Sequence, residues 1–356
     1  MAAADIVNQR LHNQQLEGGR FKQPGKVVAW LGAVQAQDYA GAKWALGMRL
    51  LDSTDASIEQ AIADKTIVRT WAMRGTLHFV TPADIHWLLA LLSSRIIAKN
   101  ARRYRELELD EQTLKRSNTM LEKALGDGKP RTRKELMAIL EEKGISTKGQ
   151  RAPYMLQRAS LDGLIVQGVA RRNDPTYLSL DESPPKAKTM KQDEALAELA
   201  RRHFTSRGPA TLKDFVWWSG LVMAEARAGL EAVKGQLVQE TIDGQTYWRS
   251  EATPAAKDRS PTAYLLPAYD EYLFAYKDRD AILNALDAKQ VKRANGFSPT
   301  LAIDGRVVGT WKRSLKKGTV VIEPAPFTKL TAAEKEAVEA AAQRYSEFLK
   351  LDVVLR

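Results

Sequence analysis

The sequence predicts an α+β protein with three tandem winged-helix units packed around a small C-terminal β-barrel-like element. One pattern, helices followed by two short strands with turn residues between them, occurs three times along the chain. After residue 253 the pattern changes to short strands without intervening helices. The 356 residues are enough for several packed units with sizeable cores.

The first unit is expected over residues 1–105. Its two strand-like runs are separated by Met73-Arg74-Gly75, and glycine favours a tight turn at such a point. The expected elements are helices at 5–16, 24–34 and 57–63, strands at 67–71 and 76–80, and a long helix at 83–105.

The second unit, residues 106–189, shows the pattern most clearly. Leu136, Ile139 and Leu140 follow helical spacing, and Gly144 ends that helix. Asn173-Asp174-Pro175 predicts a turn between two strands. Helices at 111–125, 132–143 and 152–161 are expected, followed by strands at 165–171 and 176–180. A helix-turn-helix followed by a hairpin is the winged-helix plan, with the hairpin as the wing.

The third unit is expected over residues 190–252, after an exposed linker at 183–191 that holds two prolines and three lysines. Asp243-Gly244 is a hairpin signal. The remaining part, residues 253–356, has a tight-turn signal at Asp304-Gly305. The third unit should contain helices at 193–205, 212–219 and 224–234 and strands at 237–242 and 245–249. The last part should contain strands at 264–266, 301–303, 307–311 and 320–322 and a helix at 332–349.

Composition excludes several classes of protein. Hydrophobic residues make up 44% and charged residues 27% of the chain, as in soluble globular proteins, and no run of 18 apolar residues suggests a membrane span. The absence of cysteine excludes disulfides, thiolate metal sites and a cysteine nucleophile. Phosphate-loop and dinucleotide-binding motifs are missing, and the four histidines lack metal-ligand spacing. We therefore expect a cytoplasmic, nucleoid-associated protein with no metal and no cofactor.

A net charge of +11 favours a polyanionic partner, with nucleic acid before acidic lipid. Residues 95–134 hold twelve Lys or Arg and six acids, and residues 292–317 hold seven basic residues and one acid. A solvated face explains such runs equally well. Because winged-helix units bind phosphates through helices and wings, we also expect contacts to the DNA backbone. The candidates are Arg131, Arg133, Lys134, Lys312, Arg313, Lys316 and Lys317.

Two pairs of adjacent residues, one aromatic and one acidic, are best explained by structural roles. Trp217-Trp218 could stack on bases, but the adjacent Phe215 favours a place in the core. Asp270-Glu271 could form an acid/base pair, but adjacent residues on a strand point to opposite faces. A turn or helix-cap role is therefore favoured for these acids.

The segment Gln35-Ala36-Gln37 is less ordinary. Residues two apart diverge on a helix but share a face on an extended segment. If both amides serve one site, the helix that starts at Pro24 must end or distort near Gln35. The following Ala40-Gly41-Ala42 would allow such a break.

With these residues in view, the sequence resembles the AlkZ-like family of bacterial DNA glycosylases over residues 14–349. Four ordered motifs at long separations carry the resemblance: Val34-Gln35-Ala36-Gln37-Asp38-Tyr39, Thr70-Trp71-Ala72-Met73-Arg74-Gly75-Thr76-Leu77-His78, Leu265-Leu266-Pro267-Ala268-Tyr269-Asp270-Glu271-Tyr272 and Asp304-Gly305-Arg306-Val307-Val308-Gly309-Thr310-Trp311-Lys312-Arg313.

The resemblance implies excision of alkylated purines, chiefly cationic N7-alkylguanine, and unhooking of interstrand crosslinks. The family's catalytic signature, Gln-hydrophobic-Gln, falls on Gln35 and Gln37. A sister branch of the family has Asp at the second glutamine position, so Gln37 favours the AlkZ-type branch. Ala36 is a small residue at the hydrophobic middle position. Because no Schiff-base lysine is identified, we expect a monofunctional enzyme. Its expected partner is double-stranded DNA with alkylated bases, without a membrane or an obligate protein partner.

Two other functions stay open from the sequence. A non-catalytic winged-helix DNA-binding protein, such as a regulator, would share the fold and the basic surface, but it would not need two converging amides. An RNA- or protein-binding scaffold would share the basic surface without preferring damaged duplex.

Overall fold

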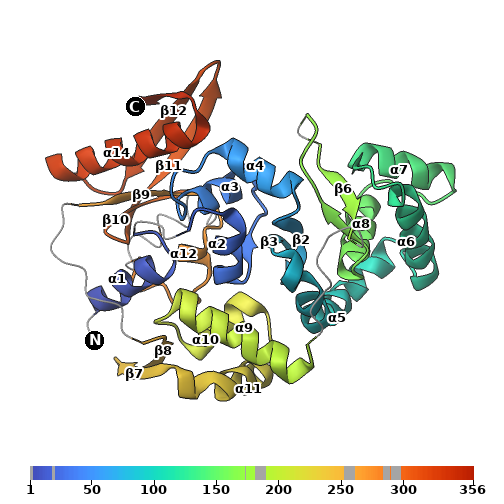
Figure 1. Cartoon of the computed structure of the whole chain (residues 1–356), viewed down its shortest axis with the longest axis horizontal. Coiled ribbons are helices and arrows are strands. Elements are labelled where there is room, and N and C mark those ends of the chain that lie inside the picture. The colour runs from blue at the N-terminus through green and yellow to red at the C-terminus, as the bar shows by residue number, and fades with distance from the viewer. Residues whose placement is uncertain are drawn as a thin grey trace. The chain divides into compact units, whose positions relative to one another are not determined.

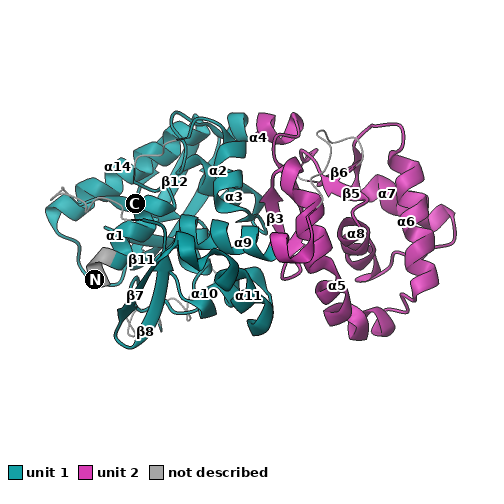
Figure 2. Cartoon of the chain, turned by 60° about the horizontal axis from the view of Figure 1, so that its bottom comes forward, with its two compact units in different colours: residues 1–58, 196–356 teal, residues 59–195 magenta. Residues whose placement is uncertain are grey.

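The computed structural model describes residues 3–17, 21–172, 174–180, 190–251, 261–283, 289 and 298–356. These residues form a mixture of helices and strands, which confirms the α+β class (Figure 1). The chain divides into two compact units: unit 1 comprises residues 1–58 and 196–356, and unit 2 comprises residues 59–195 (Figure 2). Unit 1 is thus assembled from two separate stretches of chain. The three boundaries between the four parts that the sequence pattern suggested, and the tandem winged-helix arrangement, stay predictions.

The helices of unit 1 begin and end where local signals place them. Pro24 starts the second helix at a position where its missing N–H costs nothing. Thr211 and Asp214 form a capping box, as do Thr331 and Glu334. The helices are α1 Ala3–Asn13, α2 Pro24–Leu31, α3 Tyr39–Gly47, α10 Leu212–Ser219, α11 Met223–Val233, η1 Lys234–Gln236, α12 Glu271–Phe274 and α14 Ala332–Leu349, while α4 Asp55–Ala63 and α9 Gln192–Arg207 each contain residues of both units.

A five-stranded sheet in unit 1 corresponds to the predicted C-terminal β-rich part. Its strands are β9 Ala263–Leu266, β10 Thr300–Ile303, β11 Arg306–Lys316, β12 Thr319–Pro326 and β13 Asp352–Leu355, in the order β13-β12-β11-β10-β9. Asp304 and Gly305 have φ of 47° and 77°, as the predicted tight turn requires. All neighbours are antiparallel except β13, which pairs parallel to β12 and was not predicted.

The core beneath this sheet is aromatic. Helix α14 lies against the sheet (Figure 1) and places Tyr345 with its ring centroid 4.8 Å from that of Trp44 and 5.5 Å from that of Trp311. The indole N–H groups donate to Leu265 O and Leu266 O of β9 at 2.7 and 2.9 Å. Large aromatic area with a satisfied polar end gives both burial and orientation, so this core fixes α3 against the sheet.

The repeated pattern is visible in strand pairing as well as in element order. In unit 1, α9 to α11 lead into the hairpin β7 Val238–Ile242 and β8 Gln245–Arg249, and Ala210 forms a bridge with Trp248 of β8. In unit 2, three helices, α6 Glu111–Leu125, α7 Arg133–Glu142 and α8 Arg151–Leu161, lead into β5 Ile165–Gln167 and β6 Thr176–Ser179. The short β4 Arg131–Thr132 pairs with β6. Both segments therefore bond a residue before the second helix to the last strand of the hairpin.

Unit 2 contains five paired strands and a leucine-rich core. Within it the strand order is β3-β2-β5-β6-β4, with every pair antiparallel. Arg74 and Gly75 have φ of 54° and 80° in the turn between β2 and β3. Buried leucines of the helices, including Leu114, Leu121 and Leu136, pack together in one hydrophobic cluster. The elements are β2 Val68–Met73, β3 Thr76–Val80, α5 Pro82–Glu106, α6 Glu111–Leu125, β4 Arg131–Thr132, α7 Arg133–Glu142, α8 Arg151–Leu161, β5 Ile165–Gln167 and β6 Thr176–Ser179.

Several elements differ from those that the sequence predicted. The helix expected over 24–34 ends earlier, at Leu31, and α3 was not predicted. The first wing strand is shorter than expected. Asn173 of the predicted turn and residues 183–189 of the predicted linker lie outside the described residues. In the part of the chain that the structure describes, no helix has the length and apolar character needed to cross a bilayer.

Candidate active site

The two glutamines follow a helix that stops just before them. Helix α2 ends at Leu31, and Gly32 has φ of 76°, a conformation that only glycine adopts without strain. Val34 and Gln35 then form the short extended element β1 Val34–Gln35. The expectation that the helix ends or distorts near Gln35 is therefore confirmed.

The stretch that was expected to allow the break, residues 40–42, is helical instead. Residues 40–42 lie inside α3, whose first turn is capped by Asp38: its carboxylate accepts a hydrogen bond from Gly41 N at 3.1 Å. A Cβ at Gly41 would lie 2.5 Å from Asp38 Oδ2, so glycine is needed here to let the cap close, not to break a helix.

The three residues of the motif differ in exposure. Gln35 is buried at 8% exposure, Ala36 is fully buried, and Gln37 is exposed. The segment thus passes from the interior to the surface within three residues. The small side chain of Ala36 suits its fully buried position, since a larger one would have to displace close-packed neighbours.

A buried ion pair lies behind this segment. Arg207 Nη2 lies 2.7 Å from Glu271 Oε2, and both side chains are at most 2% exposed. Glu271 Oε1 accepts from the backbone N of Gln35 at 2.9 Å. Arg207 also donates to Leu31 O at 2.6 Å and to Ala33 O at 3.0 Å. One ion pair therefore contacts the backbone on both sides of Gly32.

Glu271 is not available as an acid or base. Its two oxygens accept from Gln35 N, from Arg207 Nε and Nη2, and from Trp218 Nε1 at 3.0 Å. Three of these donors bind Oε2 and one binds Oε1, so both oxygens of the buried carboxylate are engaged in hydrogen bonds. The sequence interpretation of Asp270-Glu271 as a turn or cap is confirmed for Asp270, which caps α12 by accepting from Tyr272 N at 2.8 Å.

A second buried ion pair lies one residue earlier in the chain. Arg49 donates to both oxygens of Asp270 at 2.8 and 2.9 Å, and also to Gln14 O and Ala45 O. None of these acceptors belongs to the backbone from Leu31 to Gln37, which we call the glutamine segment. The arginines of both pairs were missed by the sequence reasoning, because nothing local marks a residue whose partners are far away in the chain.

Electrostatics and aromatic packing reinforce the first pair. Burial lowers the pKa of Arg207 from its usual value, and the negative charge of Glu271 opposes that change. The guanidinium lies over the ring of Trp218, with Cζ 4.1 Å from the centroid. The preference for a core role is confirmed for Trp218, which is 1% exposed, whereas Trp217 is 45% exposed and donates to Phe274 O.

His203 occupies the same core. Its ring centroid lies about 5 Å from those of Phe204, Phe215 and Trp218. Neither ring nitrogen has a hydrogen-bond partner among the described residues. Burial lowers the pKa of His203 well below its usual value, so the ring is neutral in the folded protein.

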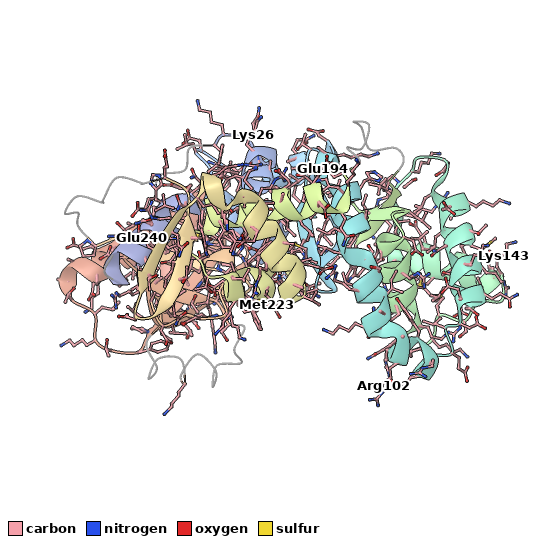
Figure 3. The ribbon with its side chains drawn as sticks, turned by 90° about the horizontal axis from the view of Figure 1, so that it is seen from below. Lys26, Arg102, Lys143, Glu194, Met223 and Glu240 are labelled. Carbon is pink, nitrogen blue, oxygen red and sulfur yellow. The ribbon has the colours of Figure 1, made fainter. Side chains whose placement is uncertain are left out.

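The basic candidates in unit 2 differ from one another. Arg131 donates to Ala124 O at 2.5 Å and pairs with Asp127 at 2.9 Å, which ties its side chain to a local turn. Lys134 is exposed in the first turn of α7, and Arg133 is half-buried. Arg102 of α5 and Lys143, which follows the last residue of α7, also project from this unit (Figure 3). Among the three predicted residues, Lys134 is thus the best placed to meet a phosphate.

The basic candidates in unit 1 follow β11. Lys312, Lys316 and Lys317 are exposed, and the last two lie at the end of the β11–β12 hairpin. Arg313 is half-buried, donates to Tyr345 Oη and lies over the Tyr345 ring. Arg313 therefore helps to fasten the strand to α14, while the three lysines face solvent. Among the described residues no group of three or more His, Asp or Glu is arranged to hold a metal ion.

Comparison with known proteins identifies the family of the chain. The family described as DNA glycosylase AlkZ-like matches residues 28–348. A curated relative, the interstrand DNA cross-link repair glycosylase of Streptomyces sahachiroi, is 27% identical over 93% of this chain and 94% of its own length. The solved structure of the Streptomyces sahachiroi DNA glycosylase AlkZ has the same fold, with a TM-score of 0.80, 24% identity and coverage of 100% of both chains. On this evidence the chain belongs to the AlkZ-like DNA glycosylase family.

Proposed function

We propose that this protein is a monofunctional DNA glycosylase that hydrolyses the N-glycosidic bond of alkylated purines, chiefly cationic N7-alkylguanine. The observation that carries the proposal is the anchored, non-helical segment that holds Gln35 and Gln37. Family membership and the name of the curated relative support the reaction class. That relative's name also supports interstrand crosslinks as substrates of this chain.

The chemistry suits two amides. An N7-alkylated guanine already carries positive charge, so it leaves with little protonation. The enzyme then has to hold a water and stabilise an oxocarbenium-like sugar. Carboxamide oxygens of Gln35 and Gln37 accept hydrogen bonds from the water and turn their negative ends toward the cation. Because an amide is a poor base at neutral pH, positioning and electrostatics supply the rate.

The reaction ends with hydrolysis and not with strand cleavage. A strand-nicking mechanism needs a free amine to form a Schiff base with the sugar. Lys43 is the first lysine after the motif, and its ammonium pairs with Asp55 at 2.8 Å inside a largely buried site. This pairing supports the monofunctional assignment.

Binding to duplex DNA comes from the winged-helix plan and the basic residues. We assign residues 106–182 and 190–250 as winged-helix units, on the basis of their element order and the shared bridge to the last hairpin strand. Lys134, Lys312, Lys316 and Lys317 contact the DNA backbone, with Arg133 as a further contact. A non-catalytic DNA-binding regulator is the second candidate, and it is favoured only by these shared features.

Single-turnover release of N7-methylguanine from duplex DNA tests the proposal. The Gln35→Ala, Gln37→Ala double variant should release base on the order of 10²-fold more slowly than the wild type, with little change in DNA affinity. Hypoxanthine and uracil duplexes serve as control substrates and should resist the wild type, since these neutral bases need a proton that no amide supplies. Equal rates for the wild type and the double variant would move the chemistry elsewhere and favour the regulator.

A further inference from the structure

The end of α2 leaves carbonyl groups in need of donors. The last carbonyls of a helix have no partner within the helix, and Gly32 turns the chain away before another turn can form. Arg207 donates to two of the carbonyls that flank this break, Leu31 O and Ala33 O. Its partner in the ion pair, Glu271, accepts from the backbone amide of Gln35.

All five N–H donors of Arg207 are used. Nε and Nη2 bind Glu271, Nη1 binds Leu31 O and Ser206 Oγ, and Nη2 also binds Ala33 O. A planar guanidinium supplies these directions together, whereas a lysine ammonium does not. The contacts that Arg207 and Glu271 make to Leu31, Ala33 and Gln35 join residues 174 to 236 positions apart in the sequence, so they define where this backbone lies relative to the core.

We infer that Arg207 and Glu271 are positioning residues for the proposed reaction: they fix the backbone from Leu31 to Gln35 and thereby aim the amides of Gln35 and Gln37. This inference rests on the proposed function of the two glutamines. Neither residue is placed against the substrate. Burial, with Arg207 at 0% and Glu271 at 1% exposure, keeps the pair away from solvent and from DNA.

The second ion pair provides a matched control. Arg49 is also 0% exposed, also uses its five donors, and also pairs with an acid at the start of α12. Its other acceptors belong to Gln14 and Ala45, not to the segment from Leu31 to Gln35. Arg207→Lys and Arg49→Lys therefore remove equivalent buried hydrogen bonds, but only the first removes contacts to the glutamine segment.

The test compares the two lysine variants at matched folded fraction. Arg207→Lys should slow single-turnover release of N7-methylguanine by roughly 10²-fold, the order of loss that a displacement of about 1 Å causes, with duplex affinity within about threefold of the wild type. Arg49→Lys should lower the melting temperature similarly and release base at the wild-type rate. Equal slowing in both variants, or no slowing in Arg207→Lys, would overturn the inference.

Amide hydrogen exchange supplies a readout that does not depend on activity. The amide of Gln35 should exchange faster in Arg207→Lys and in Glu271→Gln than in the wild type, and it should stay protected in Arg49→Lys. If Arg207→Lys does not fold, Trp218→Phe removes one donor to Glu271 and retains the aromatic packing; a smaller change in the same direction is expected. Unchanged exchange at Gln35 in every variant that removes a Glu271 contact would refute the inference.

The proposed function and this inference can fail separately. If the Gln35→Ala, Gln37→Ala variant releases base at the wild-type rate, the proposed function fails, and the exchange experiment still decides whether the ion pair fixes the segment. If the glutamine variant is slow and Arg207→Lys is not, the inference alone fails.

Discussion

The Gln35–Gln37 segment and the Arg131–Lys134 segment are both short and polar, but they are held in different ways. The backbone around Gln35 is fastened by Arg207 and Glu271, which are up to 236 residues away in the sequence. The side chain of Arg131 is fastened by Ala124 and Asp127, and Thr132 shares a capping box with Glu135. The difference matches the two proposed tasks: reaction geometry tolerates little displacement, whereas attraction to phosphates tolerates a great deal.

The largest effect that separates the two segments is expected from replacing the glycine that ends the helix beside each segment. Gly32→Ala forces a side chain into φ of 76° and should cost about 1–2 kcal/mol of stability. It should also move the carbonyls that Arg207 binds, so we expect release of N7-methylguanine to fall by roughly 10- to 100-fold. Single-turnover kinetics and urea unfolding measure the two quantities.

Gly144→Ala is the control for that variant. Gly144 ends α7 with φ of 72°, and a Cβ there meets nothing within 4 Å. A comparable loss of stability with a wild-type release rate is expected. Slowing of the same size in both variants would mean that backbone strain anywhere in the chain lowers activity, and the contrast between the segments would disappear.

The same contrast explains what the sequence could predict. The hairpin turns at Asp243-Gly244 and Asp304-Gly305 were predicted because two adjacent residues determine a tight turn, and their φ values agree. Helix α3 was missed because Gly41 suggested a break, although Asp38 caps a helix there. Strand β13 was missed because helix α14 separates it in the sequence from its partner, β12.

The candidate site divides in a similar way. The end of α2 near the glutamines was predicted from the geometry of residues two apart, and the role of Gln35 and Gln37 came from resemblance to a family. The buried arginines could not be predicted, because pairs such as Arg207 with Glu271 depend on which distant parts of the chain meet. Single-sequence patterns show period and turns, and they do not show such meetings.

Charge reversal in unit 2 should have a smaller effect, on binding and not on release. Lys134→Glu should reduce the slope of log Kd against log salt by about one unit, the value for one phosphate contact, and weaken duplex binding about threefold or more. Arg131→Glu should change the slope less, because Arg131 is tied to Asp127. Fluorescence anisotropy between about 50 and 200 mM salt measures both slopes. A larger change for Arg131 than for Lys134 would mean that its local ion pair opens to meet DNA.

The remaining predictions concern pH. The folded protein keeps His203 neutral because burial lowers its pKa, while an unfolded histidine takes up a proton below about pH 6.5. Stability is therefore lost as the pH falls below about 6.5, with a slope of up to about 1.4 kcal/mol per pH unit. Urea unfolding at pH 7 and pH 5.5 should show this loss in the wild type but not in His203→Phe.

The capping box beside Arg131 responds in a different pH range. A hydrogen bond from the Thr132 backbone lowers the pKa of Glu135. The stability that the Glu135 carboxylate contributes is therefore present above its unfolded pKa of about 4.5, and it is lost as the pH falls further. Thr132→Ala should cost about 1 kcal/mol, equally at pH 7 and pH 5.5. A pH-dependent cost between these two values would contradict this account of the cap.

The split composition of unit 1 has a consequence for how the protein is made. Residues 59–195 form a compact unit that is complete before the ribosome reaches Leu196. Gln35 is synthesised early, but the carboxylate that binds its amide follows 236 residues later. At about 5–20 residues per second, that interval lasts roughly 12–50 seconds. The glutamine segment therefore waits for most of the chain, and a nascent chain that stops short of Glu271 carries both glutamines without the ion pair that holds them.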